Sequence, residues 1–214
     1  MNTIRCKRNG AFLILGLALV LGAFSGTMPL SNAPRESSGD ANVMPRLASL
    51  EQTWSRTWGG ADTDSGYGVA ADGDGNAYLA GKTSSFGASP SDAFLVKYAP
   101  NGTLLWNRTW GGTSDDSGRG VAADGTGNAY LAGYTSSFGA GPSDAFLVKY
   151  APNGTQLWNQ TWGGADYDYG YGVAADGNGN AYLAGYTSSF GAGPSDAFLV
   201  KYAPDGNQPW NRTR

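Results

Sequence analysis

The sequence predicts an all-β protein made of three repeated units, and three observations lead to this fold class. The tripeptide Trp-Gly-Gly occurs at residues 58–60, 110–112 and 162–164, which gives a period of 52 residues. The chain contains 34 glycines and 13% aromatic residues, a composition typical of β proteins with many turns. No stretch after residue 30 carries the 3.6-residue hydrophobic period of a helix.

The N-terminus has the pattern of an export signal. Three basic residues lie between positions 5 and 8, and an apolar run follows at 11–24. The small residues Ala23 and Ser25 then offer a cleavage site, so we expect a signal peptide over 1–25 and a secreted or cell-surface protein. An uncleaved N-terminal signal anchor is the alternative, and it would also place the bulk of the chain outside the membrane.

A repeat domain at 53–214 follows a polar, aperiodic stretch at 26–52, which we interpret as a linker. Each unit begins at a tryptophan, and the units are 54–105, 106–157, 158–209 and a partial one at 210–214. The second and third units agree at roughly four positions in five, so the period is not a chance pattern.

Within the first unit we expect four short strands, at 67–72, 76–83, 92–99 and 103–110. Asp-Gly-Asp-Gly separates the first two and Pro-Asn-Gly the last two, and both are typical of tight turns with glycine at positive φ. The third strand is a continuous apolar run, which predicts burial on both faces. Four antiparallel strands in about 50 residues make up the blade of a β-propeller.

The sequence GVAADGDGNAYLAG at 68–81, with SDAFLVKYAPNGTLLWNRTWGG at 91–112, resembles the SBBP repeat of the seven-bladed β-propeller family. The resemblance covers 53–214 and implies the propeller fold, with no common activity and no catalytic residues. The unit count departs from that family, because propellers usually need four to eight blades to close a ring. The alternatives are an open array, a fragment, or a ring closed by oligomerisation, such as six blades from two chains.

The fourth-strand pattern also occurs once more, ahead of the first blade, at 53–58. The chain therefore has four copies of the outer strand and three of each other strand, and the spare copy would suit a latch for another blade. Trp106, Arg108 and Trp110 alternate along their strand and share one face. We expect that face to pack against a neighbouring blade, with the arginine stacked on an aromatic ring.

Asp72, Asp74 and Asn76 begin the pattern of a calcium loop, in which oxygen ligands stand at alternating positions. The pattern then fails, because the ninth position is Ala80, and Asp74 becomes threonine and asparagine in the other units. The stretch is therefore interpreted first as a hairpin turn, with calcium as the alternative.

A second candidate site lies where the fourth strand of one blade leads to the first strand of the next. In a four-stranded meander, this connection and the link between the second and third strands emerge on the same side. One face should thus gather acidic and aromatic side chains that bind a ligand: Asp64, Asp116, Asp168, Tyr67, Tyr171, Phe86, Phe138 and Phe190. The position of Tyr67 is Arg119 in the second unit. The alternative is that the aspartates accept backbone N–H bonds in tight loops.

The residue types present argue against catalysis. The chain has no histidine, and its one cysteine, Cys6, precedes the apolar run, so the common catalytic triads and zinc sites lack members. Paired carboxylates for glycoside hydrolysis are the remaining option, but an active site breaks symmetry whereas these aspartates repeat. We expect no enzyme activity, no cofactor and, at a net charge of −3, no nucleic-acid partner.

Five sequons are candidates for N-glycosylation, at Asn101, Asn107, Asn153, Asn159 and Asn211. The sequence therefore predicts an exported, non-catalytic structural or interaction module at the cell surface. Its partner would be a protein or glycan there, with homo-oligomers as a further option and membrane contact only through an uncleaved signal. The alternative function is a carbohydrate- or calcium-binding, lectin-like module, and a hydrolase comes third.

Overall fold

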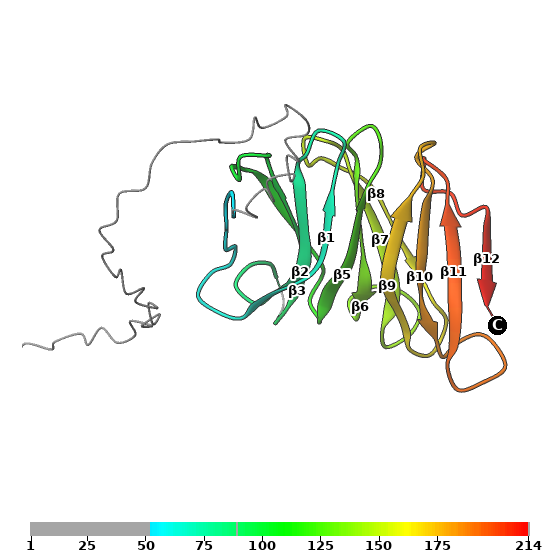
Figure 1. Cartoon of the computed structure of the whole chain (residues 1–214). Coiled ribbons are helices and arrows are strands. Elements are labelled where there is room, and N and C mark those ends of the chain that lie inside the picture. The colour runs from blue at the N-terminus through cyan, green and yellow to red at the C-terminus, as the bar shows by residue number, and fades with distance from the viewer. Residues whose placement is uncertain (1–51, 89, 214) are drawn as a thin grey trace, which may run out of the picture. The chain divides into compact units, whose positions relative to one another are not determined.

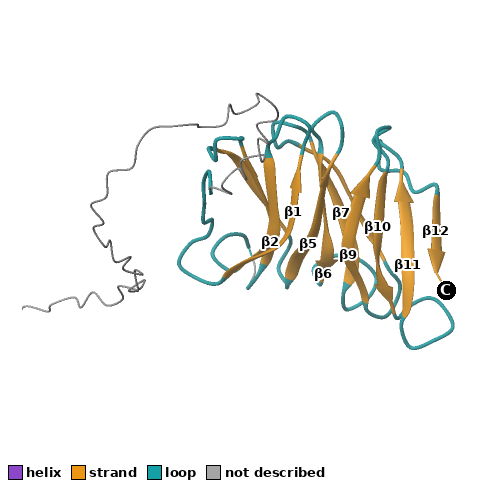
Figure 2. Ribbon diagram, in the orientation of Figure 1, coloured by secondary structure: helices purple, strands orange, loops and turns teal. Residues whose placement is uncertain are grey.

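Twelve β-strands form the regular structure of residues 52–88 and 90–213, the part of the chain that the computed structural model describes (Figures 1 and 2). They make three antiparallel sheets of four strands, and each sheet follows the order of the sequence. This confirms the predicted all-β fold of three blades. The predicted signal at 1–25 and residues 26–51 of the predicted linker lie outside the described residues. Within the described ranges, no helix has the length and apolar character needed to cross a membrane.

Each blade contributes strands of nearly the same length. The first contains β1 (Asp64–Ala71), β2 (Ala77–Thr83), β3 (Asp92–Tyr98) and β4 (Leu104–Trp110). The second contains β5 (Asp116–Ala123), β6 (Ala129–Thr135), β7 (Asp144–Tyr150) and β8 (Gln156–Trp162). The third contains β9 (Asp168–Ala175), β10 (Ala181–Thr187), β11 (Asp196–Tyr202) and β12 (Trp210–Thr213).

The first strand of each blade starts three residues earlier than the sequence predicted. In β1, the register shifts between Gly66 and Gly68, so Tyr67 is the extra residue of a β-bulge. The ladder continues beyond the bulge and pairs Asp64 with Thr83. Asp64 and its equivalents are therefore strand residues rather than loop residues. The alternating pattern missed them because a bulge interrupts the two-residue period.

The hairpin turns occur where they were expected, but only one of the two glycines in the first turn adopts positive φ. Gly75 has φ of 79°, whereas Gly73 is not among the residues with positive φ. Gly102, in the turn between β3 and β4, has φ of 77°. These two positions require glycine, because the left-handed region is unfavourable for other residues.

The outer strand of each of the first two blades packs on the next blade, as predicted. The Trp110 ring lies 4.2 Å from the Phe146 ring in the second blade, and the Trp106 ring lies 6.2 Å from Tyr150. Trp106 also donates a 2.9 Å hydrogen bond to the carbonyl oxygen of Pro152. The Arg108 guanidinium lies 5.9 Å from the Trp106 ring. The apolar core of the protein therefore lies between neighbouring blades, and the tryptophans of the outer strands β4 and β8 form part of it.

Residues 53–58 contact the first blade in the same way, although they form no strand. Trp54 donates a 3.0 Å hydrogen bond to the carbonyl oxygen of Pro100, and Trp58 lies 4.3 Å from Phe94. The segment thus occupies, on the first blade, the place that β4 occupies on the second. It was expected as a fourth strand, but no described strand lies beside it to supply ladder hydrogen bonds.

The three blades form an open array in the described residues, in which the innermost strands β1, β5 and β9 pack side by side in order (Figure 1). Burial of the third strand depends on its place in this array. β3 and β7 are buried along their whole length, as predicted, but the prediction is wrong for β11. Leu199 in β11 is 39% exposed, because no described blade covers that side of the third sheet.

Candidate functional site

The three aspartates predicted to bind a ligand have structural hydrogen bonds instead. Asp116 and Asp168 are completely buried. One oxygen of Asp116 accepts a 2.8 Å hydrogen bond from the Gly112 amide and a 2.7 Å bond from the Ser137 hydroxyl. These carboxylates hold the Gly-Gly turn against the neighbouring loop. The prediction that they face a ligand in solvent therefore needs correction, since the alternative, capture of loop N–H groups, describes them.

Asp64, in the first blade, has the same role with fuller hydrogen bonding. It accepts bonds from the Gly60 amide at 2.8 Å, from the Ser85 hydroxyl at 2.7 Å and from the Thr83 hydroxyl. Burial raises the pKa of Asp64, but the bonds from Thr83, Gly60 and Ser85 outweigh it and hold the pKa below its usual range. Asp64 is therefore an ionised acceptor whose oxygens are used within the blade.

The two loops that were expected to meet do lie together. The amide of Ser84 donates a 2.9 Å hydrogen bond to the carbonyl oxygen of Thr63, and the amide of Asp62 donates a 3.0 Å bond to Ser85. Phe86 lies at this junction and is 44% exposed. Its ring packs 5.2 Å from Trp58, and Phe138 and Phe190 pack on the tryptophans of their own junctions in the same way. The phenylalanines therefore cover the tryptophans.

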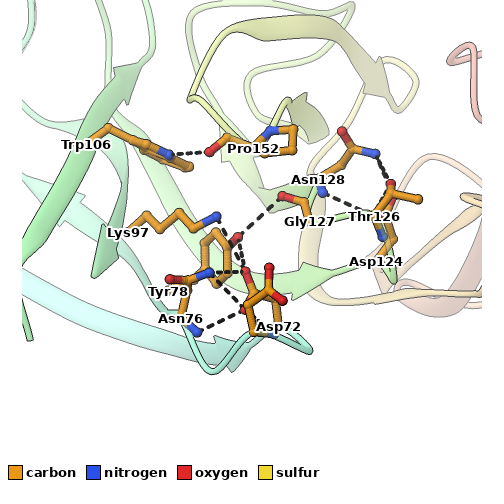
Figure 3. Close-up of polar contacts among 11 residues, drawn as sticks. Asp72, Asn76, Tyr78, Lys97, Trp106, Asp124, Thr126, Gly127, Asn128 and Pro152 are labelled. Atoms are coloured by element: carbon orange, nitrogen blue, oxygen red, sulfur yellow. Dashed lines mark hydrogen bonds and ion pairs between the residues drawn. The ribbon is translucent and has the colours of Figure 1, made fainter. Parts of the chain in front are cut away.

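The calcium candidates lie in the β1–β2 hairpin, where protein donors surround Asp72 (Figure 3). Its carboxylate accepts hydrogen bonds from the amides of Asp74 and Asn76, from the Asn76 side chain and from the Tyr78 hydroxyl. Lys97 lies 3.4 Å away in an ion pair whose two side chains are almost fully buried. In the described part of the chain, no cluster of three or more acidic, histidine or cysteine residues is arranged to hold a metal ion.

These donors explain the acidity of Asp72. Burial raises its pKa, but hydrogen bonds from Asn76 and Tyr78, with the charge of Lys97, lower it to about 2. In the second blade, Asp124 likewise accepts hydrogen bonds from Asn128 (Figure 3) and from the Tyr130 hydroxyl, whereas Lys149 donates to the carbonyl oxygen of Pro204 in the third blade. There the Tyr130 hydroxyl lies 3.0 Å from Asp124 and 3.0 Å from the carbonyl oxygen of Gly179 in the third blade. We call this set of contacts the hairpin network, and it ties neighbouring blades together.

A different group of side chains lies along the start of the innermost strands. Tyr67, at the bulge of β1, is 47% exposed. The guanidinium of Arg119, at the bulge of β5, lies 4.2 Å from the Tyr67 ring and 5.2 Å from the Tyr134 ring. Arg119 also donates a 2.9 Å hydrogen bond to the Tyr134 hydroxyl. The arginine is thus held between tyrosines of two blades by cation–π contacts.

The same group extends into the third blade through ring contacts. Tyr134 lies 4.6 Å from Tyr169, which in turn contacts Tyr186 at 5.2 Å. Tyr167 and Tyr171 stack on either side of Tyr169, at 6.0 and 6.4 Å, and are 50% and 47% exposed. An ion pair of 4.0 Å between Lys82 and Asp115 joins the first two blades. The inner-strand surface, as we call it, comprises Tyr67, Lys82, Asp115, Arg119, Tyr134, Tyr167, Tyr169, Tyr171 and Tyr186.

This surface is where the nearly identical units differ most in chemistry. Four equivalent positions exchange small, charged and aromatic residues: Thr63, Asp115 and Tyr167; Ser65, Ser117 and Tyr169; Tyr67, Arg119 and Tyr171; Lys82, Tyr134 and Tyr186. The β1–β2 register pairs Ser65 with Lys82, and the equivalent pairs follow in the other blades. The remaining differences lie in exposed turns, at the Trp-Gly-Gly junctions and on the outer strands.

Sequence reasoning found part of this surface. It selected Tyr67 and Tyr171 and noted Arg119 as their equivalent, but it missed Tyr134, Tyr169 and Tyr186. The signal for these residues was present as differences between the units. It was not recognised because the bulge hides the pairing of the first two strands.

Comparison with known families supports the repeat assignment. The model of the SBBP family, described as a beta-propeller repeat, matches residues 53–87, 109–139 and 161–191. The chain carries three SBBP β-propeller repeats. The resemblance predicted from the sequence is therefore confirmed, and each match contains the first two strands of one blade.

Two individual proteins are similar to these SBBP repeats. The regulatory protein FlaEY of Caulobacter vibrioides is 30% identical over 138 residues, which are 55% of this chain and 14% of that protein. The chain therefore corresponds to a small part of this relative. A crystal structure of a protein of unknown function from Bacteroides caccae is 14% identical with a TM-score of 0.43, over 70% of this chain and 46% of that chain.

Proposed function

We propose that this protein is an exported, non-catalytic interaction module of the cell surface that holds a partner against its inner-strand surface. The observation that carries the proposal is the distribution of differences between the units. The blades repeat their cores and hairpin networks, whereas the inner-strand surface combines different side chains from each blade. Such asymmetry suits a binding surface made from three blades, because a partner without the repeat's symmetry presents different groups to each blade.

The chemistry of the surface suits recognition. Tyrosine and arginine are enriched at the energetic centres of protein interfaces. Tyrosine offers a large contact area with few flexible bonds. Tyr67, Tyr167 and Tyr171 each leave about half of their surface open to solvent. Arg119 is fixed between two rings, so its charge is positioned before a partner arrives.

The placement of the carboxylates supports a non-catalytic role. General acid and base groups must reach the substrate, and paired carboxylates do this in glycoside hydrolysis. Asp116 and Asp168 are instead buried and accept hydrogen bonds from turn amides. The exposed side chains near them include the carboxylates of Asp115 and Asp166 and the Tyr167 ring.

The test is binding of the labelled, purified protein to the surface of the cells that produce it. We expect saturable binding, which the triple variant Tyr67→Ser, Arg119→Ser, Tyr171→Ser weakens about tenfold or more. The matched control is Leu105→Ser with Leu157→Ser, because these outer-strand leucines are equally exposed, at 49% and 51%. Equal binding by the triple variant and the wild type would contradict the proposal.

Pretreatment of the cells identifies the class of partner. A protein partner predicts that protease removes the binding and that periodate leaves it intact. A carbohydrate is the second candidate, favoured by the exposed tyrosine rings, whose apolar faces and polar hydroxyls suit sugars. In that case, periodate removes the binding and protease does not.

A further inference from the structure

The face of the third sheet that points away from the second blade has the composition of an interface between blades, yet no described blade covers it. Leu95 and Leu147 occupy equivalent positions in the first two blades and are completely buried by the blade that follows. Leu199 is their equivalent in the third blade and is 39% exposed. With Ala197 and Arg212 it lines an open hollow beside β12. This side of the sheet is therefore equivalent to two surfaces that other blades cover.

The face of the first sheet that points away from the second blade corresponds to the other half of that interface. Val121 in the second blade is 9% exposed because the first blade covers it, but the equivalent Val69 is 78% exposed. Val69 lines a hollow with Leu79 and Trp54. The two ends of the array are thus the two halves of an interface that already occurs twice within the chain.

Close backbone packing of the innermost strands leads to the same conclusion. A methyl group on Gly68 would lie 3.1 Å from the carbonyl oxygen of Arg119 in the next blade. A methyl group on Gly120 would lie 2.9 Å from the carbonyl oxygen of Tyr171. The third glycine of this series, Gly172, has nothing within 4 Å of that position. Its lack of a side chain is needed only when another innermost strand lies against β9.

We propose that a second copy of this chain docks head to tail, with its first blade against the third blade of its partner. Two such contacts join two chains into a closed ring of six blades, a number within the usual range for propellers. A head-to-tail contact forms a ring when the rotation between copies closes, and a ring of six blades requires the same rotation at the two contacts between chains as at the contacts within each chain.

In the docked dimer, two segments could form the fourth strand of the third blade, beside β11. One is β12 of the same chain, and the other is 53–58 of the second copy, which already lies on its own first blade. The pattern places tryptophan at Trp58, Trp110 and Trp162 but arginine at Arg214. Trp58 packs on the buried ring of Phe94, whereas the equivalent residue after β12 is an arginine and has no ring. We therefore expect 53–58 of the second copy to replace β12 beside β11.

The first test is the mass of the protein by light scattering, compared among matched variants. The wild type is expected as a dimer. Gly172→Val and Val69→Asp should each give folded monomers, because each change alters an open position on one end only. Leu157→Arg is the control, since Leu157 is 51% exposed on β8 and away from both ends, and it should remain a dimer.

Mixing the two monomeric variants tests the head-to-tail geometry itself. Gly172→Val keeps an intact first blade, and Val69→Asp keeps an intact third blade, so one contact in a mixed pair is undamaged. We expect mixed dimers, although neither variant dimerises alone. Hydrogen exchange of the wild-type dimer should show protection of amides within 55–58 and faster exchange within 211–213. A monomeric wild type, a dimer that survives Gly172→Val, absence of mixed dimers, or unprotected amides at 55–58 would each overturn the proposal.

Discussion

The hairpin network and the inner-strand surface belong to the same blades, but the units preserve one and vary the other. Asp72, Asn76, Tyr78 and Lys97 recur unchanged in all three units, and the tyrosine hydroxyls of the first two hairpins contact the next blade. On the inner-strand surface, serine is exchanged for tyrosine and tyrosine for arginine. The difference separates two roles. The residues of the hairpin network and of the apolar core between blades are repeated, whereas those of the inner-strand surface differ from blade to blade, although some of them also contact a neighbouring blade.

The largest effect is expected where an outer strand enters the next blade. Trp110 is 9% exposed and packs 4.2 Å from Phe146. Trp110→Ala should lower the free energy of unfolding by about 3–5 kcal/mol, because it leaves a cavity between blades. Urea unfolding measures the change. Leu157→Ala, on an exposed face, is the control and should cost less than about 1 kcal/mol, and equal losses would contradict this account.

The next effect compares two buried tyrosine hydroxyls in one blade. The Tyr130 hydroxyl contacts Asp124 and the third blade, whereas the buried Tyr150 hydroxyl has no hydrogen-bond partner among the described residues. Tyr130→Phe should lower the free energy of unfolding by about 1–3 kcal/mol. Tyr150→Phe should change it little or raise it, because it removes an unsatisfied polar group. The reverse order in urea unfolding would contradict the proposed role of the hairpin network.

Acid should weaken the hairpin network within a defined pH range. The folded-state pKa of Asp72 is about 2, below its unfolded value near 3.8. The ionised carboxylate therefore stabilises the fold fully above pH 4, and this contribution is lost as the pH falls towards 2. Thermal unfolding across this range should show a falling Tm. Asp72→Asn should reduce the dependence, and an unchanged slope in that variant would assign the acid sensitivity to other groups.

The smallest effect on stability is expected on the inner-strand surface. Tyr171 is 47% exposed, and its ring contacts are with other tyrosines of the same surface. Tyr171→Ser should lower the free energy of unfolding by less than about 1 kcal/mol. A loss as large as that of Trp110→Ala, measured in the same urea series, would show that this surface holds the blades together.

The sequence predicted what depends on local patterns. The period of 52, the strand alternation and the turn glycines gave three four-stranded blades, and the spacing of Trp106 and Trp110 gave their packing on the next blade. Features that depend on a neighbour were missed. Leu199 belongs to the same apolar run as Leu95 and differs only in having no blade beside it.

The candidate site was predicted in part for a similar reason. A carboxylate in a turn pattern looks the same whether it faces solvent or accepts turn amides. Only the bulge that brings Asp64 into β1, and places its equivalents Asp116 and Asp168 under the Gly-Gly turn, distinguishes the two cases. Tyr67 was predicted because it lies beside the connection between blades on the expected face, and it is exposed in the structure.

One measurement tests most directly whether the variable surface is for binding and the repeated part for folding. The variant Asp115→Tyr with Arg119→Tyr gives the second blade the residues that the third blade has at these positions. Cell-surface binding and urea unfolding are then measured on the same preparation. The account predicts a free energy of unfolding within about 1 kcal/mol of the wild type and binding weaker by about tenfold or more. Unchanged binding by this folded variant would contradict the account.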